Sequence, residues 1–248
     1  MQTVKPIRTL LYGAEAPGLR AEVEKHPSLS LVKDKPDVVV SYGGDGTLLA
    51  AEQKWPGIPK VPIRNSRRGH RCIPHPAPDV IERLVKDELA RTEFMKLVCR
   101  VESARGESQT LTAMNEINVH MGHINSAVRF KFWYNGVAFE NGLEIIGDGF
   151  VVSTPFGSTA YFNQITRGLF FSGIGAAFKY TAQHTNHLVM PEDTDIRISI
   201  TRGPAVLAYD NATDFRELRE GDELHIRKHV QPAMILTWEP IASPSDTF

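Results

Sequence analysis

The spacing of apolar residues changes near residue 92, and this change constrains the fold of the chain more than any other feature. Before it, short apolar runs alternate with stretches of helical spacing. We expect strands at residues 7–12, 29–32, 37–42 and 60–64, and helices at 17–25, 48–54 and 78–89. Strands that alternate with helices in this way are typical of an open, largely parallel sheet.

Beyond residue 92 the apolar runs predict strands joined mostly by short turns. The expected strands span 94–101, 110–114, 117–120, 127–134, 136–143, 150–153, 195–201, 205–209, 223–228 and 234–238. The dipeptides Asn135-Gly136 and Asn141-Gly142 are strong hairpin signals, and segment 168–183 is expected to form a loop and a helix. The pattern predicts a β-rich domain of sandwich type, or two packed sheets.

We therefore expect an α/β domain in residues 1–91, a β-rich domain in residues 92–233, and a C-terminal segment in residues 234–248. That last segment either frays or packs back on the first domain. The hydrophobic fraction of 42% and the charged fraction of 23% are those of an ordinary globular protein.

Charge and cysteine content exclude some classes of partner and site. A formal charge of -1 gives no sign of nucleic acid or an anionic membrane as partner. No apolar run is long enough to span a bilayer, and the first twenty residues lack the apolar core of a secretory signal. Cys72 and Cys99 do not have the spacing of a metal site. The simplest interpretation is a reduced, cytoplasmic protein, with a disulfide between them as the alternative.

A glycine-rich motif with one acid, Gly43-Gly44-Asp45-Gly46-Thr47, follows the expected strand 37–42. Ligands of open α/β sheets bind at the carboxyl ends of the strands. Glycine amides form an anion nest, in which a carboxylate is costly beside phosphate unless it acts on a proton or a metal. Asp45 is therefore a candidate general base or magnesium organiser for phosphoryl transfer. A tight turn with a solvated aspartate is the alternative.

Residues 148–161, which read Asp-Gly-Phe-Val-Val-Ser-Thr-Pro-Phe-Gly-Ser-Thr-Ala-Tyr, predict a buried strand that runs into a hydroxyl-rich turn. Pro155 and Gly157 mark the turn. We expect Ser158 or Thr159 to cap a following helix and leave free amides at its start. Such a corner can hold a polar ligand.

The polar pair Asn115-Glu116 lies between the apolar runs 111–114 and 117–120. Its amide and carboxylate are able to hydrogen-bond neighbouring ribose hydroxyls. The alternative is a bulge or an edge-strand pair with a purely structural role.

Taken in this order, the three motifs resemble the successive signatures of the NAD kinase family. The resemblance covers about residues 37–238. The glycine-rich motif alone is also found in lipid kinases of the same superfamily, whereas the long third motif is specific to NAD kinases.

The resemblance implies phosphoryl transfer from ATP, or polyphosphate in some members, to the 2′-hydroxyl of the adenosine ribose of NAD, giving NADP. It also implies a divalent metal, expected to be Mg²⁺, whose ligands the sequence does not reveal. Asp45 would take the proton from the hydroxyl. The family forms dimers and tetramers, and Asp210 resembles the acid that dimers lend to the partner's site.

The remaining site residues are also implied by the resemblance. Asn115 and Glu116 would hold a ribose of NAD, and Asp148 would contact the nicotinamide part. The full expected NAD site consists of Asp45, Gly46, Asn115, Glu116, Asp148, Thr159, Ala160, Tyr161, Asn163 and Gln164. Of these, Thr159, Ala160 and Tyr161 would frame the adenine and its ribose. The donor phosphates would contact Gly43, Gly44, Gly46 and Thr47, with Arg64, Arg67 and Arg68 as further candidates.

The chain departs from the family pattern around the acceptor. Segment 64–71 reads Arg-Asn-Ser-Arg-Arg-Gly-His-Arg where the family has an apolar, glycine-containing segment. Its arginines are able to grip extra phosphates, and a solvated basic loop is the alternative. Segment 162–168 replaces a Gly-Gly pair, and Ile146 stands where a basic residue is common. Two other functions therefore stay open: a kinase of a lipid or another small alcohol, and an inactive dinucleotide-binding regulator.

Overall fold

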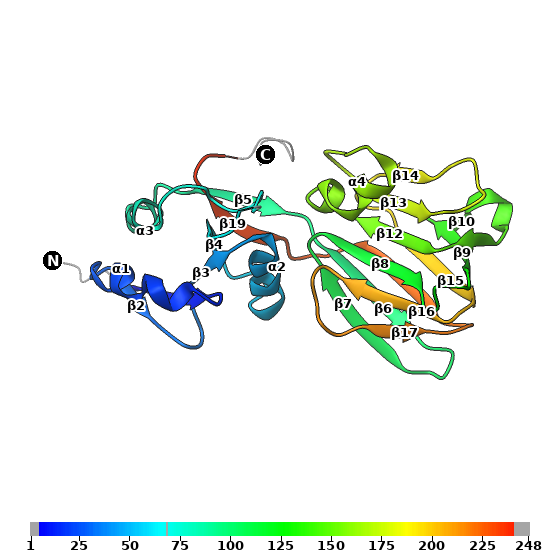
Figure 1. Ribbon diagram of the computed structural model, residues 1–248, viewed down its shortest axis with the longest axis horizontal. Coiled ribbons are helices and arrows are strands. Elements are labelled where there is room, and N and C mark those ends of the chain that lie inside the picture. The colour runs from blue at the N-terminus through cyan, green and yellow to red at the C-terminus, as the bar shows by residue number, and fades with distance from the viewer. Residues whose placement is uncertain (1–4, 68, 241–248) are drawn as a thin grey trace. The chain divides into compact units, whose positions relative to one another are not determined.

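The computed structural model describes residues 5–67 and 69–240 and divides into two compact units. The first unit comprises Met1–Phe94 and Pro232–Phe248, and the second comprises Met95–Gln231. Figure 1 shows the first unit with helices and strands and the second unit built mainly from strands. No helix in the described part of the chain has the length and apolar character needed to cross a membrane.

The first unit contains a six-stranded sheet with the order β2-β1-β3-β4-β19-β5. Its strands are β1 (Ile7–Tyr12), β2 (Leu29–Leu31), β3 (Val38–Gly43), β4 (Lys60–Arg64), β5 (Ala90–Phe94) and β19 (Ala233–Thr237). All neighbours pair in parallel except β5, which is antiparallel to β19. The predicted open, mostly parallel sheet is thus confirmed. In Figure 1 the C-terminal strand β19, drawn in red, lies between β4 and β5.

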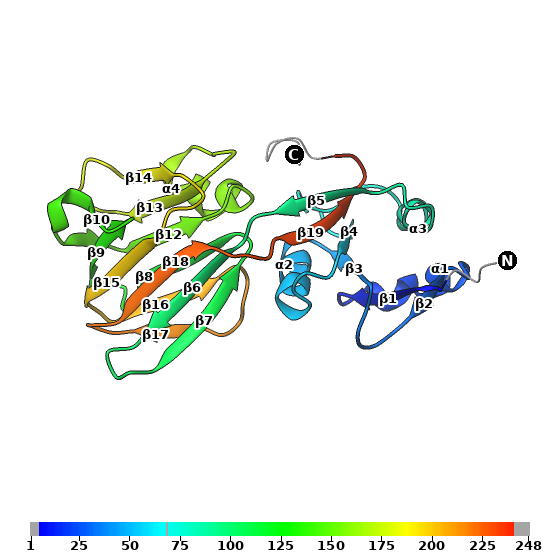
Figure 2. The same ribbon diagram turned by 180° about the vertical axis from the view of Figure 1, so that it is seen from behind.

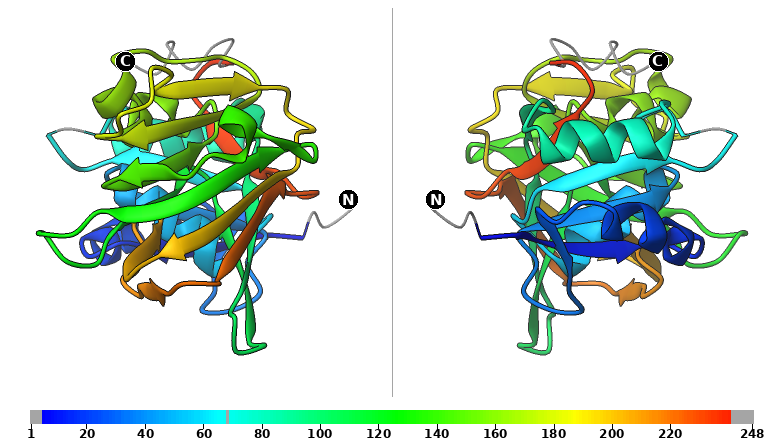
Figure 3. Two further views of the ribbon diagram at one scale, coloured as in Figure 1. Left: turned by 90° about the vertical axis from the view of Figure 1, so that its right-hand side faces the viewer. Right: turned by 90° about the vertical axis from the view of Figure 1, so that its left-hand side faces the viewer.

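Helices cover both faces of this sheet. They are the 3₁₀ helix η1 (Ala16–Leu19), α1 (Arg20–Glu24), α2 (Asp45–Lys54) and α3 (Ala77–Val85). Val38 and Val40 belong to the apolar cluster that includes α1 and α3, whereas Val39 packs in a cluster with Ala51 of α2. Successive strand residues point to opposite faces, so the β-branched run of β3 is buried on both sides. The right-hand view of Figure 3 shows α1 and α3 in front of the strands.

The second unit contains two mostly antiparallel sheets. One has the order β10-β9-β15-β18-β6-β7, with β11 also paired to β9, and the other has the order β14-β13-β12-β8-β16-β17. The first sheet consists of β6 (Leu97–Glu102), β7 (Ser108–Ala113), β9 (Val128–Tyr134), β10 (Val137–Ala138), β11 (Ile145–Gly147), β15 (Ile196–Arg202) and β18 (Glu223–Lys228). The second consists of β8 (Glu116–Met121), β12 (Gly149–Ser153), β13 (Ile174–Lys179), β14 (His187–Met190), β16 (Ala205–Tyr209) and β17 (Arg216–Leu218). Figure 2 shows β18 in orange between β15 and β6.

A shared apolar core joins the two sheets. Phe130 of β9 packs on Phe150 of β12 with ring centroids 4.8 Å apart, and Phe132 packs on Phe178 of β13 at 5.5 Å. These four rings are almost fully buried and belong to one cluster. Because aromatic rings of both sheets interdigitate, the unit is a β-sandwich, as the sequence predicts.

Three local expectations are wrong. Segment 168–183 contains the buried strand β13 instead of a helix. Its small residues are compatible with either element, and β13 is fixed by pairing with β12 and β14. Asn141-Gly142 does not form a hairpin turn but lies in the 3₁₀ helix η2 (Phe139–Gly142), where Asn141 has a φ of 54°. Both cysteines are buried free thiols, so the disulfide alternative is also wrong.

Candidate active site

Asp45 is the first residue of α2, directly after the turn that follows β3. The first turn of a helix has free backbone N–H groups and a partial positive charge, both of which favour a carboxylate. A Cβ on Gly43 would lie 2.3 Å from Thr47 Oγ1. Only glycine therefore allows α2 to begin so close to the end of β3. The motif places its acid at the carboxyl edge of the parallel sheet.

The segment after β4 folds over the carboxylate of Asp45. The backbone N–H of Arg71 donates to Oδ1 at 2.8 Å, and the backbone N–H of His70 donates to Oδ2 at 3.1 Å. The Cys72 thiol lies 3.7 Å from Oδ1. Burial raises the pKa of this thiol, and the Asp45 carboxylate raises it further. The thiol therefore stays protonated and acts as a weak donor to Asp45.

The arginines of this basic segment differ in exposure. Arg64 and Arg67 are exposed, whereas Arg71 is buried beside Asp45. Burial lowers the pKa of Arg71 to about 10, an effect that the nearby Asp45 carboxylate opposes. A fully solvated basic loop is thus the wrong interpretation for Arg71, one of the four arginines that the sequence offered for binding extra phosphates. Arg68 lies outside the described residues.

In the second unit, one face of the β8 sheet carries polar side chains. Residues two apart on a strand share a face, so Glu116, Asn118 and His120 point the same way. Gly149 of β12 pairs with His120 on one side and with Lys179 of β13 on the other. We call Glu116, Asn118, His120 and Lys179 the polar face. The edge-strand interpretation of Asn115-Glu116 is wrong, because β8 lies between β12 and β16.

Glu116 and Lys179 are both buried in this polar face. Glu116 is 7% exposed, and none of the described residues forms a hydrogen bond with its Oε2 atom. Lys179 is 3% exposed and donates to the Asn118 side chain and, at 2.9 Å, to the Val119 carbonyl. Burial raises the pKa of Glu116 to about 8, and the Asp210 carboxylate adds to the rise while Lys179 opposes it. An unpartnered buried oxygen is a ready acceptor or donor for a ligand hydroxyl.

Burial lowers the pKa of Lys179 to about 8, and the carboxylates of Glu116 and Asp148 oppose that change. Sequence reasoning missed Lys179, Asn118 and His120. The alternation from Glu116 along β8 was a signal for Asn118 and His120. Lys179 gave no signal, because the strand that holds it was not expected. Position 146 holds an isoleucine that is 44% exposed, and the cation that interacts with Asp148 is Lys179 of β13.

Three segments of the second unit meet at the backbone of Asn115. The Thr154 N–H donates to the Asn115 carbonyl at 2.9 Å, and a Cβ on Gly157 would lie 2.2 Å from that same oxygen. The carboxylate of Asp210 accepts the N–H groups of Met114 at 2.8 Å, Asn115 at 2.7 Å and Glu116 at 3.2 Å. These contacts shape the entry to β8 and orient Asn115 and Glu116. Asp210 thus binds its own chain, and its intersubunit role stays a prediction.

Ser158 and Thr159 of the third motif do not cap the following helix as expected. Ser158 donates to the Pro155 carbonyl at 2.7 Å, and Thr159 donates to the Phe156 carbonyl at 3.4 Å. Both lie in the 3₁₀ helix η3 (Gly157–Thr159), where each hydroxyl bonds back three residues along the chain. The next helix, α4 (Tyr161–Thr166), begins after Ala160 without a side-chain cap. The amides at its start are left uncapped.

Asp148, Tyr161 and Gln164 line one pocket with a volume of about 580 Å³, together with Arg167 and Lys179. We call it the Asp148 pocket. The Lys179 ammonium lies 4.8 Å from the centre of the Tyr161 ring. Asn163 instead donates to the Gly168 carbonyl at 3.1 Å and closes the end of α4. The structure therefore gathers part of the predicted acceptor site in this pocket.

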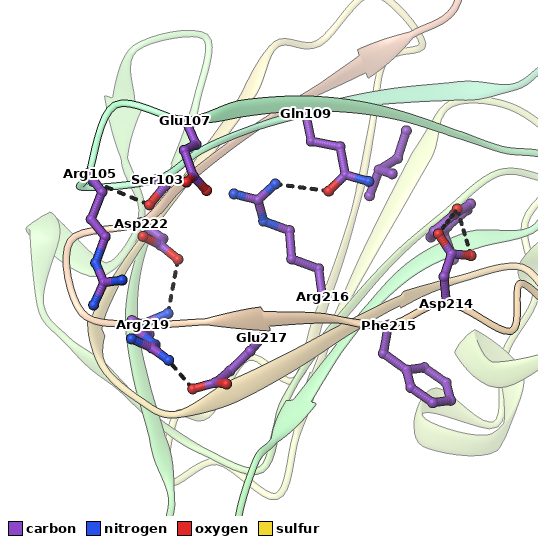
Figure 4. Close-up of a pocket in the computed structure, with 12 residues that line it drawn as sticks. Ser103, Arg105, Glu107, Gln109, Asp214, Phe215, Arg216, Glu217, Arg219 and Asp222 are labelled. Carbon is purple, nitrogen blue, oxygen red and sulfur yellow. Dashed lines mark hydrogen bonds and ion pairs between the residues drawn. The ribbon is translucent and has the colours of Figure 1, made fainter.

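Another pocket of the second unit, of about 360 Å³, contains none of the site residues predicted from the sequence. Figure 4 shows its charged lining. Arg216 donates to Gln109 at 2.8 Å, and Arg219 donates to Glu217 at 3.1 Å. Much of its polar lining is thus engaged by neighbouring protein groups.

No group of three or more His, Cys, Asp or Glu side chains in the described ranges 5–67 and 69–240 is placed to hold a metal ion. The carboxylate of the glycine-rich motif, Asp45, is an oxygen ligand of the kind that Mg²⁺ prefers. Mg²⁺ is commonly bound by one or two carboxylates together with the phosphates of a substrate. The motif fits that mode of binding and does not fit a metal cage made by the protein alone.

Comparison with known proteins identifies the family. No protein-family model matches the chain. The NAD kinase of Streptococcus thermophilus is 30% identical over 203 residues, which cover 75% of this chain and 71% of that protein. The chain belongs to the NAD kinase family. The NAD kinase of Xylella fastidiosa is 25% identical over 251 residues, which cover 97% of this chain and 93% of that protein.

Solved structures share the fold of this NAD kinase family member. Yeast NADH kinase complexed with NADH superposes with a TM-score of 0.84 at 16% identity and covers 98% of this chain and 86% of that chain. An NAD kinase from Archaeoglobus fulgidus in complex with ATP superposes with a TM-score of 0.76 at 20% identity and covers 94% of both chains. The chain is thus an enzyme, a kinase that phosphorylates NAD.

Proposed function

We propose that the enzyme transfers a phosphoryl group from ATP to the 2′-hydroxyl of the adenosine ribose of NAD, giving NADP, with Asp45 as the general base. The observation that carries the proposal is the fixed carboxylate of Asp45 at the start of α2, held by two backbone N–H groups. The Oδ2 atom, which accepts the His70 N–H, has a second lone pair, so it can still accept a hydrogen bond from a sugar hydroxyl.

A sugar hydroxyl is a poor nucleophile at neutral pH, so the reaction depends on positioning and on removal of its proton. A positioned general base contributes about 10²–10⁴-fold to the rate. The remaining acceleration comes from alignment of the two substrates and from neutralisation of the phosphate charge. The amides at His70 and Arg71 hold the carboxylate still, which favours a fixed geometry of proton transfer.

On the donor side, we propose that the ATP phosphates lie against Gly43, Gly44, Gly46 and the hydroxyl of Thr47. The Thr47 N–H already donates to the Gly44 carbonyl at 2.9 Å, so its hydroxyl is the group that remains for a phosphate. The exposed Arg64 and Arg67 would neutralise further phosphate charge. ATP is favoured over polyphosphate because the NAD kinase from A. fulgidus was solved in complex with ATP. Bound Mg²⁺ would neutralise phosphate charge, held by the donor phosphates and Asp45.

On the acceptor side, we propose that Asn115 and Glu116 hold a ribose and that Asp148 contacts the nicotinamide end. The unpartnered Oε2 of Glu116 supports the first assignment. The Asp148 pocket supports the second, because its volume of about 580 Å³ is that of a small-molecule site. Thr159, Ala160 and Tyr161 would frame the adenosine, with Asn163 and Gln164 beside them. A homodimer or homotetramer is proposed from the family.

The test is the Asp45→Asn variant. We expect its turnover to fall about 10²–10⁴-fold while its affinity for NAD changes only a few-fold, because only the proton acceptor is lost. The matched control is Asp79→Asn, which changes an exposed acid in the first turn of α3. Turnover is measured with ATP and NAD, and glucose-6-phosphate dehydrogenase detects NADP. Near wild-type turnover of Asp45→Asn would refute the assignment of the base.

The same assay separates the other two functions. An inactive regulator would bind NAD, as measured by calorimetry, without forming NADP. A kinase of a lipid or another small alcohol would consume ATP only when that alcohol is present. Membership of the NAD kinase family argues against both. Replacing ATP by polyphosphate in the assay tests the choice of donor.

A further inference from the structure

The Asp148 pocket has more positive than negative charge. Lys179 and Arg167 line it, and Asp148 is the one carboxylate among its lining residues in the described part of the chain. His120, Tyr161 and Tyr180 are the other titratable side chains that line it. Glu116 lies on the same polar face, but burial raises its pKa to about 8, so at neutral pH it adds little negative charge. The pocket therefore carries an excess of about one positive charge.

The ammonium of Lys179 is held at the wall of this pocket. It donates to the Asn118 side chain and to the Val119 carbonyl, and it faces the Tyr161 ring at 4.8 Å. Because Lys179 is only 3% exposed, water screens its charge poorly. A cationic ligand in the pocket would meet this charge, and the Tyr161 ring already has a cation beside it.

We propose that Lys179 makes the enzyme prefer NADH to NAD⁺ as its phosphoryl acceptor. The two dinucleotides have the same adenosine and phosphates and differ at the nicotinamide ring, which is cationic in NAD⁺ and uncharged in NADH. A pocket with an excess positive charge disfavours the cationic ring and tolerates the uncharged one. The inference rests on the proposed function, because it requires the nicotinamide end to bind in the Asp148 pocket.

The test compares kcat/KM for NADH and NAD⁺ in the wild type and in Lys179→Met. Methionine keeps an unbranched chain and removes the charge. We expect the wild type to favour NADH and the variant to shift the ratio about tenfold toward NAD⁺, the size expected for one poorly screened charge. Chromatography with ATP as donor quantifies NADPH and NADP⁺ directly.

Two further variants make the comparison specific. Arg167→Met removes the other cation of the pocket and should shift the ratio in the same direction by a smaller factor. This variant tests the same inference if Lys179→Met does not fold. Lys131→Met is the control for charge, because Lys131 alternates with the core residues Phe130 and Phe132 on the other sheet and points away from the core. It should leave the ratio unchanged.

The outcomes separate this inference from the proposed function. If both dinucleotides are phosphorylated and neither pocket variant changes the ratio, the inference is overturned and the function stands. If the wild type binds the dinucleotides without phosphorylating them, the proposed function fails. Calorimetric Kd values then test the inference: a lower Kd for NADH than for NAD⁺ supports it, and equal values overturn it. If neither dinucleotide binds, both are overturned.

Discussion

Replacing Lys60 with methionine is expected to destabilise the first unit by about 3–5 kcal/mol. Lys60 lies on β4 and is fully buried, and its ammonium forms an ion pair with Glu52 of α2, which is 4% exposed. Lys60 also donates to the Trp55 carbonyl at 2.6 Å, and the Gly57 N–H donates to Glu52 at 3.3 Å. The pair ties the sheet to the helix that begins with Asp45.

The size of the effect follows from what each variant leaves behind. Lys60→Met leaves the Glu52 carboxylate buried with its main counter-charge removed, which is the costly case for a buried pair. In the double variant Lys60→Met/Glu52→Leu both charges are gone, but the Trp55 carbonyl loses its donor and the Gly57 N–H loses its acceptor. Each of these losses costs about 1 kcal/mol. The double variant is therefore expected to be more stable than the single variant by about 1–3 kcal/mol.

Urea unfolding followed by tryptophan fluorescence measures these differences. In a Trp133→Phe background the remaining tryptophans, Trp55 and Trp238, both belong to the first unit. Lys86→Met is the control, because its pair with Glu82 on α3 is about half exposed and should contribute less than about 1 kcal/mol. The reasoning is refuted if Lys60→Met costs no more than Lys86→Met, or if adding Glu52→Leu restores nothing.

Two other perturbations test the second unit. Burial raises the pKa of Glu116 to about 8. Between about pH 5 and pH 8 the folded protein therefore keeps a proton that the unfolded chain has lost. The free energy of unfolding is thus expected to fall as pH rises through this range. Glu116→Gln should flatten this part of the profile, as measured by urea unfolding at both pH values, and an unchanged slope would contradict the role of Glu116. Gly157→Ala would place a Cβ 2.2 Å from the Asn115 carbonyl, so we expect a loss of about 1–3 kcal/mol and a raised KM for NAD. The matched change Gly18→Ala, at a glycine where nothing lies within 4 Å of the added Cβ, calibrates the cost of the substitution without crowding, and equal effects of the two variants would rule out the crowding of Asn115 as the cause.

Local patterns in the sequence were enough to predict the types of most elements. The strand–helix alternation of the first unit and the strand-rich second unit both depend on the spacing of apolar residues, which neighbouring residues determine. The expected strand 37–42 and helix 48–54 differ from β3 and α2 by only a few residues at their ends. Segment 168–183 was predicted wrongly because Gly175, Ala176 and Ala177 have no strong local preference, and β13 exists through its pairing with β12 and β14.

The candidate site likewise contains residues that the sequence reveals and contacts that only the fold creates. Asp45, Asn115 and Asp148 could be named from motifs, because the chemistry of each motif lies in consecutive residues. Other contacts join residues that are far apart in the chain. The amides of His70 and Arg71 hold Asp45, and Asp210 holds the start of β8. No periodicity in the sequence predicts such contacts.

The sequence by itself determined most of the element types, the order of the motifs and the family. The tertiary structure decided that β19 lies between β4 and β5 and that Lys179 faces the same pocket as Asp148. The physical reason is strand register: a shift of one residue turns every side chain of a strand to the other face, and register is set by packing between distant segments.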